Sequence, residues 1–243
     1  MTLRVFIADL HLRAEAADQA RFGAFLERFG AGSELFVLGD LFDLWLGDDI
    51  DLPRFEPVIE ALDAYAGRGG VAHVMAGNHD FLFGTAFFEK SGARPLVDPT
   101  IIEHAGQRLL LTHGDELCTA DVDYQAFRAR IREPAFTADF LAKPPAERVQ
   151  IARGFQDASR SATAAKAADV MEVDAVAANA ALIEAGAIIL LHGHTHRPGV
   201  HRLPAGRRVV LGPWHGGESA LVWPADGPPQ PVNMGCDTHD LID

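Results

Sequence analysis

The chain has 243 residues, 48% of them hydrophobic, which is enough to bury the core of one large domain. Its formal net charge of -13 argues against a nucleic-acid partner, because phosphates would be repelled over most of the surface. The 2 cysteines are too few for a disulfide framework, and no apolar run approaches the roughly 18 residues of a bilayer span. With first residues that lack the pattern of a secretory leader, these totals predict a cytoplasmic protein.

The first part of the chain alternates short apolar strands with amphipathic helices. Strands are predicted at 4–8, 34–38 and 71–76, and helices at 17–29 and 53–65. The strands lead into three polar motifs, which are Asp9-Leu10-His11, Gly39-Asp40-Leu41-Phe42-Asp43 and Gly77-Asn78-His79-Asp80. Open α/β sheets place their ligands at such strand ends, so these residues are candidates for a shared site. Asp48 and Asp49, which follow Gly47, are interpreted as turn or surface residues.

Two further strand ends carry similar chemistry later in the chain. A hairpin around Gly106 is predicted to end at His113. A core helix at 171–185 and a strand at 187–191 lead to Gly193-His194-Thr195-His196, whose alternating imidazoles can point at two neighbouring ions. Closing antiparallel strands are predicted at 208–211 and 219–222. The tail from Pro224, rich in Pro, Gly and Asp, is expected to be poorly ordered.

Between these motifs lies a segment of different composition, about 121–170, which we call the insertion. Its prolines divide it into several helices, and residues 124–170 hold 8 Lys and Arg against 5 Asp and Glu, a surplus of 3 positive charges. One interpretation is an ordinary packing subdomain. The other is a lid whose cations bind phosphates and whose apolar face binds an apolar group or contacts a membrane surface. In both interpretations the insertion belongs to a single domain spanning 1–243.

The strand-end residues are suited to two divalent metal ions. Oxygen donors mixed with imidazoles, without cysteine, favour Mn²⁺, Fe²⁺ or Zn²⁺, and Asp40 is the natural carboxylate to bridge two ions. Asn78 offers a neutral oxygen, whereas His79 could ligate, act as an acid or bind a phosphate oxygen. The chain has no phosphate-binding loop with Lys, no dinucleotide fingerprint and no nucleophile elbow. The pattern therefore predicts metal-assisted hydrolysis of a phosphoester or phosphoanhydride.

In this order, the motifs resemble those of the calcineurin-like metallophosphoesterases. The resemblance implies a four-layer α/β/β/α sandwich with the site at the strand ends. It assigns one metal ion to Asp9, His11, Asp40 and His196. It assigns the other ion to Asp40, Asn78, His113 and His194. Asp40, Asn78, His79 and His113 are the expected catalytic residues, and Mn²⁺ is the expected metal.

A closer resemblance is to the family of bacterial UDP-2,3-diacylglucosamine diphosphatases of the lipid A pathway. Stretches that carry it include LGDLFDLWLGDD (38–49), HGDELCTAD (113–121), YQAFRARI (124–131) and HGHTHRP (192–198). The resemblance implies hydrolysis of UDP-2,3-diacylglucosamine to UMP and 2,3-diacylglucosamine 1-phosphate, with peripheral contact at the cytoplasmic face of the inner membrane. The substrate contacts that it implies are Asn78, His79, Asp121, Ser159, Thr163, Lys166 and His194.

The chain departs from that family at two of these positions. His79 stands where the family usually has Arg, and Thr163 stands where an Asn contact is usual. His79 leaves open a second function, that of another two-metal phosphoesterase such as a nucleotide pyrophosphatase or phosphodiesterase. A non-catalytic scaffold with this fold would be expected to lose ligands, whereas every ligand position here is filled. The sequence makes no prediction of the oligomeric state.

Overall fold

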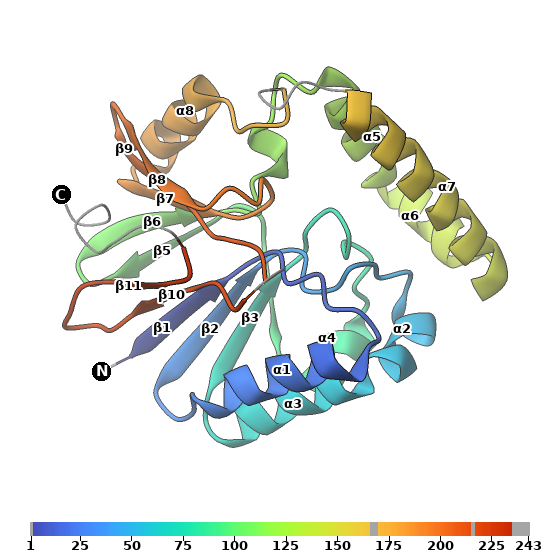
Figure 1. Cartoon of the computed structure of the whole chain (residues 1–243), viewed down its shortest axis with the longest axis horizontal. Helices are drawn as coiled ribbons and strands as arrows, with labels where there is room; N and C mark the ends of the chain where they lie inside the picture. The colour runs from blue at the N-terminus through green and yellow to red at the C-terminus, as the bar shows by residue number, and fades with distance from the viewer. Residues whose placement is uncertain (1, 166–169, 215–216, 235–243) are drawn as a thin grey trace.

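The computed structural model describes residues 2–165, 170–214 and 217–234, which contain two β-sheets lying face to face (Figure 1). The first sheet has the strand order β11-β10-β1-β2-β3-β4 and the second the order β5-β6-β7-β9-β8. β1 to β4 pair in parallel, and β10 and β11 extend the first sheet on one side with antiparallel pairing. In the second sheet β6, β7 and β9 pair in parallel, with antiparallel β5 and β8 at the two edges. The strands are β1 Leu3–Ile7, β2 Ser33–Leu38, β3 Val71–Met75, β4 Arg94–Leu96, β5 Thr100–His104, β6 Gln107–Leu111, β7 Ile189–His192, β8 Gly199–Leu203, β9 Gly206–Val210, β10 Ala220–Trp223 and β11 Gln230–Val232.

The central strands read as continuous apolar runs because both of their faces are buried. Side chains alternate across a strand, so Phe36 and Leu38 of β2 point into the core between the two sheets. Leu35 and Val37 point the other way, into the core beneath the helices. Each such side chain, once buried, contributes roughly 1.5–3 kcal/mol to folding. A one-residue shift of register would exchange the two faces, which is why the parallel pairing of β1 to β3 is well specified.

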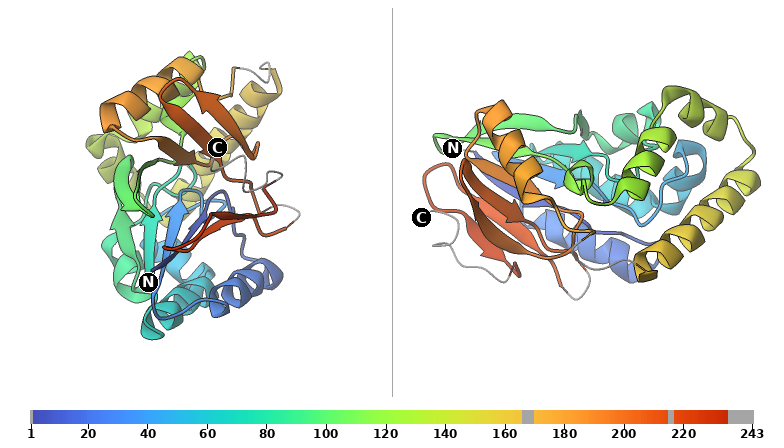
Figure 2. Two further views of the ribbon diagram at one scale, coloured as in Figure 1. Left: turned by 90° about the vertical axis from the view of Figure 1, so that its left-hand side faces the viewer. Right: turned by 90° about the horizontal axis from the view of Figure 1, so that it is seen from above.

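Helices cover the outer face of each sheet. Helices α1, α3 and α4 lie on the first sheet and α8 lies on the second, where Leu182 packs among Leu110 and Leu190 (Figures 1 and 2). The predicted four-layer α/β/β/α sandwich is therefore confirmed. The helices are α1 Ala16–Glu27, α2 Asp48–Arg54, α3 Glu56–Gly67, α4 Thr85–Ser91, α5 Val122–Ile131, α6 Pro134–Leu141, α7 Pro145–Ala165 and α8 Ala175–Ala185, with a short 3₁₀ turn, η1, at Asp115–Leu117.

The single helix predicted at 53–65 was wrong in its boundaries. Two helices occupy this region, and the chain breaks between them at Phe55, whose φ is -114°. Pro57 lies in the first turn of α3, a position where its missing N–H is tolerated. Asp48 was also misassigned as a turn or surface residue. It begins α2, and its carboxylate accepts hydrogen bonds from the N–H groups of Gly84 (2.9 Å) and Phe87 (3.0 Å) at the start of α4.

The expectation of a poorly ordered tail from Pro224 was wrong for residues 224–234, whereas 235–243 lie outside the described residues. Residues 230–232 form β11, which pairs with β10 at the edge of the first sheet. β4, β8 and α4 were not predicted either, since their short apolar patterns are weak signals. Among the described residues, no helix is both long and apolar enough to cross a membrane.

The insertion forms α5, α6 and α7, which Figure 1 shows beside the end of the sandwich toward which β1, β2 and β3 point. In the view from above in Figure 2, these helices reach away from the two sheets. The strand-end loops thus lie between the sandwich and the insertion.

Candidate metal centre

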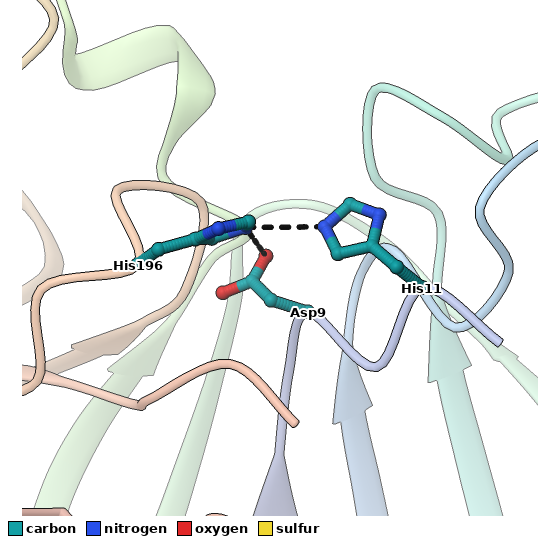
Figure 3. A group of neighbouring side chains, drawn as sticks. All are labelled: Asp9, His11 and His196. Atoms are coloured by element: carbon teal, nitrogen blue, oxygen red, sulfur yellow. Dashed lines mark hydrogen bonds and ion pairs between the residues drawn. The ribbon is translucent and has the colours of Figure 1, made fainter. Parts of the chain in front are cut away.

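Asp9, His11 and His196 meet at one end of the site, although 185 residues separate the two histidines (Figure 3). The Nε2 atoms of the two imidazoles are 3.1 Å apart, and His196 Nε2 lies 3.7 Å from a carboxylate oxygen of Asp9. With metal–nitrogen bonds of about 2.0–2.1 Å, two nitrogens on one ion lie about 3 Å apart. This spacing fits a group of three residues that holds a divalent ion.

Asp40 lies between this group and a second one. Its Oδ2 atom is 3.6 Å from Nε2 of His11 and 3.6 Å from Nε2 of His113. Its other oxygen accepts a hydrogen bond of 2.9 Å from the backbone N–H of His79. One carboxylate therefore faces imidazoles from both groups, which is the arrangement predicted for a bridging ligand.

Asn78 completes the second group. Its side-chain oxygen lies 2.9 Å from Nε2 of His113 and 2.9 Å from Nδ1 of His194. His113 is held from its other ring nitrogen, which lies 2.9 Å from the carbonyl oxygen of Leu38. That contact orients Nε2 toward the site. The structure thus brings together all seven residues predicted as metal ligands.

The backbone at these loops is strained. Most non-glycine residues avoid positive φ, at a cost of roughly 1–2 kcal/mol each. Only a few described non-glycine residues have positive φ, and most of them belong to the predicted ligand set. They are Asp9 (53°), His11 (44°), Asp40 (54°), His194 (67°) and His196 (56°). Such strain persists only where the surroundings hold it, and it points to these loops as functional.

Glycines allow the loops to approach the ligand side chains. Gly39 has a φ of 90°, and a Cβ atom there would overlap the ring of His113. A Cβ atom on Gly193 would come within 2.5 Å of a carboxylate oxygen of Asp9. Gly39 is therefore required by both its backbone conformation and its neighbour, and Gly193 by its neighbour.

Burial and neighbouring charges act in opposite directions on the pKa values of the site residues. It raises the pKa of Asp9 to about 7, since the nearby Asp40 adds to the cost of a buried negative charge and His113 only partly offsets it. Burial also opposes ionisation of Asp40, but His113, His79 and His11 together hold its pKa below the usual range. Burial disfavours the charged form of His113, yet Asp40, Asp115 and Asp9 raise its pKa to about 9. Buried carboxylates among imidazoles form a donor set that a divalent cation would neutralise.

His79 lies next to the predicted ligands. Its Nδ1 is 2.8 Å from the carbonyl oxygen of Asp43, and its ring packs edge-on against His11 with centroids 4.7 Å apart. Together with His11 and Asp40 it forms another group whose candidate ligand atoms lie within 4.8 Å of one another. The position of its ring is compatible with each role that the sequence left open.

A cavity of about 580 Å³ extends from the metal groups to the insertion. Its polar lining includes Asp43, Asn78, His79, Asp121, Asp123, Tyr124, Arg128, Arg132 and Gln156. Its apolar lining includes Leu44, Trp45, Phe81, Leu82, Phe127, Ile131, Phe140 and Phe155. A cavity with both kinds of lining can hold a molecule that has one charged part and one apolar part.

Only some of the predicted substrate contacts have side chains in the described part of the structure. Asn78 and His194 lie in the second metal group. Asp121 is the N-cap of α5, where its carboxylate accepts a hydrogen bond of 3.1 Å from the N–H of Tyr124, and it also lines the cavity. Ser159 and Thr163 lie on α7, but their side chains are outside the described part of the structure. Lys166 lies outside the described residues.

Several residues of the site had no predicted role, notably Asp115, Tyr124, Arg128 and Arg132. Asp115 is buried two residues after His113, and the other three line the cavity. Arg and Tyr at four-residue spacing after a strand-end Asp could have been noticed. However, no local sequence pattern predicts that these side chains form hydrogen bonds to Asp115.

Comparisons with known proteins agree with this geometry. The model of the calcineurin-like phosphoesterase family matches residues 4–198. A protein of Aromatoleum aromaticum named UDP-2,3-diacylglucosamine hydrolase is 41% identical over 237 residues, which cover 95% of this chain and 97% of the relative. One of the same name from Xanthomonas campestris pv. campestris is 43% identical over 236 residues, covering 92% and 96%.

Among solved structures, Vps29 of Entamoeba histolytica complexed with zinc aligns with a TM-score of 0.46 and 12% identity, over 97% of this chain and 95% of that one. The family match spans every strand-end motif from Asp9 to His196. The chain belongs to the calcineurin-like phosphoesterase family.

Proposed function

We propose that the chain hydrolyses the pyrophosphate bond of UDP-2,3-diacylglucosamine, releasing UMP and 2,3-diacylglucosamine 1-phosphate. One observation carries the proposal: an apolar cavity beneath the insertion opens directly onto Asn78 and His79 of the metal groups. A substrate with a pyrophosphate next to two acyl chains needs this combination. The relatives of that name, alike over more than nine-tenths of both chains, support the same assignment.

Two divalent ions are part of the proposal. Asp9, His11, Asp40 and His196 would hold one ion, and Asp40, Asn78, His113 and His194 the other. The donor set contains oxygen and nitrogen but no sulfur, which suits Mn²⁺, our proposed metal. When bound, such ions supply Lewis acidity and an activated water at neutral pH.

The remaining roles fall to side chains that line the cavity. Asn78 and His194 face the position of the phosphates, and the guanidinium groups of Arg128 and Arg132 balance their charge. His79 contacts a phosphate oxygen, because UMP leaves as a stable anion and needs little protonation. Asp121, Ser159, Thr163 and Lys166 complete the proposed contacts to the substrate.

The mouth of the cavity supports contact with a membrane. Phe127 and Phe155 line the cavity, stack edge-to-face at 5.2 Å between centroids, and remain 37% and 38% exposed. Leu141 and Val122 of the same insertion are exposed as well. We place the protein in the cytoplasm, with the insertion touching the inner membrane that holds the lipid substrate.

One residue favours a second candidate function. His79 lies edge-on to His11 in a Gly-Asn-His-Asp motif, where it could protonate a poor leaving group. This chemistry would suit another two-metal phosphoesterase, such as a nucleotide pyrophosphatase or phosphodiesterase.

The test is hydrolysis with added Mn²⁺ of UDP-2,3-diacylglucosamine, UDP-glucose and bis-p-nitrophenyl phosphate in parallel. UMP release from the lipid substrate, with little from UDP-glucose, is the expected result. Turnover of the small esters alone would reject the lipid substrate and favour the second candidate. Flotation with vesicles of phosphatidylethanolamine and phosphatidylglycerol tests the membrane contact separately, and absence of binding would reject that part alone.

A further inference from the structure

Helix α5 lines the cavity with Tyr124, Arg128 and Ile131, yet it has little buried apolar surface to hold it there. Ile131 is the one buried residue of the helix. Val122 is 71% exposed and Phe127 is 37% exposed. Since most helices in proteins are held by an apolar face, the position of α5 depends on other contacts.

Those contacts converge on Asp115, which lies two residues after His113 and is fully buried. Its Oδ2 atom accepts hydrogen bonds from the hydroxyl of Tyr124 (2.9 Å), from Nε of Arg128 (2.8 Å) and from Nη2 of Arg132 (3.3 Å). Its backbone carbonyl accepts a fourth, of 2.7 Å, from the side chain of Gln125. Asp115 is therefore bonded to successive turns of α5, from Tyr124 near its start to Arg132 just after its end.

The same side chains reach the loops of the second metal group. Nη2 of Arg132 also donates to the carbonyl oxygen of Gly77, at 3.0 Å, next to Asn78. The ring of Tyr124 stacks over His194, with centroids 5.9 Å apart and planes at 30°. Helix α5 is thereby connected to three separate loops of the metal centre.

The charges around Asp115 explain why its carboxylate can hold α5 in place. Both guanidinium groups donate to the same buried oxygen of Asp115, at 2.8 Å and 3.3 Å, so one carboxylate faces two cations. Bonds from a guanidinium to an ionised carboxylate are about twice as strong as neutral ones and fix its orientation. Arg128 and Arg132 are also the cations that line the described cavity.

We propose that Asp115 is a positioning residue, which fixes α5 and thereby holds Arg128 and Arg132 where they receive the phosphates of the substrate. The role in substrate binding rests on the function proposed above. The fixing of α5 does not, because it follows from the contacts alone.

The first test measures the helix without any substrate. Asp115→Asn keeps the shape of the side chain and removes its charge. Amide hydrogen exchange in peptides covering 122–131 should become at least about tenfold faster, while exchange in β1 and β2 stays unchanged. The matched control is Glu116→Gln, since Glu116 is 60% exposed and meets Arg128 only from outside, at 3.4 Å. Unchanged exchange in Asp115→Asn would overturn the proposal.

The second test separates positioning from a general defect. With UDP-2,3-diacylglucosamine, KM should rise about tenfold or more and kcat should stay within about threefold, with the metal content of the wild type. An unchanged KM, or a loss of bound metal, would overturn the proposal. If the wild type does not hydrolyse this substrate, the proposed function fails while the exchange experiment still decides the fixing of α5.

A second variant covers the case in which Asp115→Asn does not fold. Tyr124→Phe removes one donor to Asp115 without leaving a buried charge unpaired. It should shift both the exchange of 122–131 and KM in the same direction by a smaller amount. If it changes neither, the proposal is wrong.

Discussion

Gly77 lies against the carboxylate of Asp40 so closely that a Cβ atom at Gly77 would overlap Asp40 Oδ1. Asp40 follows β2 and Gly77 follows β3, and these strands pair in parallel. Their end loops are therefore neighbours, and the backbone of one forms the wall of the pocket that holds the side chain of the other. The position of the bridging carboxylate depends on the absence of a side chain at Gly77.

Gly77→Ala is expected to displace Asp40 and to reduce metal binding and turnover together. The reason is steric, since the new methyl group and the carboxylate compete for one space. Metal content per chain, measured after dialysis, and hydrolysis of UDP-2,3-diacylglucosamine would report the loss. Gly67→Ala is the matched control because a Cβ atom there meets nothing within 4 Å. Wild-type metal content in Gly77→Ala would contradict the described packing.

Asp40→Ala should remove both metal ions, whereas His196→Ala should affect mainly one. Asp40 Oδ2 faces His11 and His113 at equal distances of 3.6 Å, so its loss removes a ligand from each group. Among the candidate groups of the described residues, His196 belongs to the one with Asp9 and His11. We expect turnover in Asp40→Ala to fall by roughly 10³-fold or more. A stoichiometric metal pair in this variant would show that Asp40 does not bridge.

Arg148 connects α7 of the insertion to the loop before α2, and its removal should destabilise the fold. Its side chain is only 2% exposed, pairs with Asp49, and donates a hydrogen bond of 2.7 Å to the carbonyl oxygen of Leu46. Arg148→Met leaves that carbonyl without its partner, at an expected cost of about 1–3 kcal/mol in the free energy of unfolding.

The Asp49 pair itself adds little to this cost, because that carboxylate is 58% exposed. Chemical denaturation of Arg148→Met beside Arg153→Met, an exposed residue of the same helix, measures the difference. A change below about 0.5 kcal/mol in both variants would show that the contact is not stabilising.

Cys118 is expected to be unreactive in the folded protein. Burial, reinforced by Asp115 and Glu172, raises the pKa of its thiol to about 12, and the residue is 1% exposed. At pH 8 only about one thiol in ten thousand would be ionised, and the thiolate is the reactive form. In a Cys236→Ser background, titration with a thiol-reactive dye should label Cys118 only after denaturant is added. Rapid labelling of the native protein would contradict this burial.

The site motifs were predictable because they need only local information. An apolar run that leads into Asp, Asn or His, directly or after one small residue such as Gly or Thr, marks a buried strand with polar residues at its end. Asp9, Asp40, Asn78 and His113 were each found in this way, as were the two histidines after β7. The same alternation of the strands, read with the family resemblance, was enough to predict the layered fold.

Local errors had local physical causes. The single helix at 53–65 failed because apolar spacing continues through a break at Phe55 that periodicity alone does not reveal. The tail looked unstructured by composition, but β10 offers β11 a strand edge with which to pair. In the tail, a tertiary neighbour decided the outcome over local propensity.

By itself, then, the sequence determined the identity of the candidate ligands, the layered α/β architecture and the presence of a helical insertion with a surplus of cations. Only the tertiary structure decided which candidate ligands lie side by side, how Asp40 faces both groups, and that Asp115 bonds to side chains of α5. The reason is that periodicity encodes which face of an element is buried but not what lies opposite. The partners of Asp9 and Asp115 are set when the two sheets and the insertion pack together.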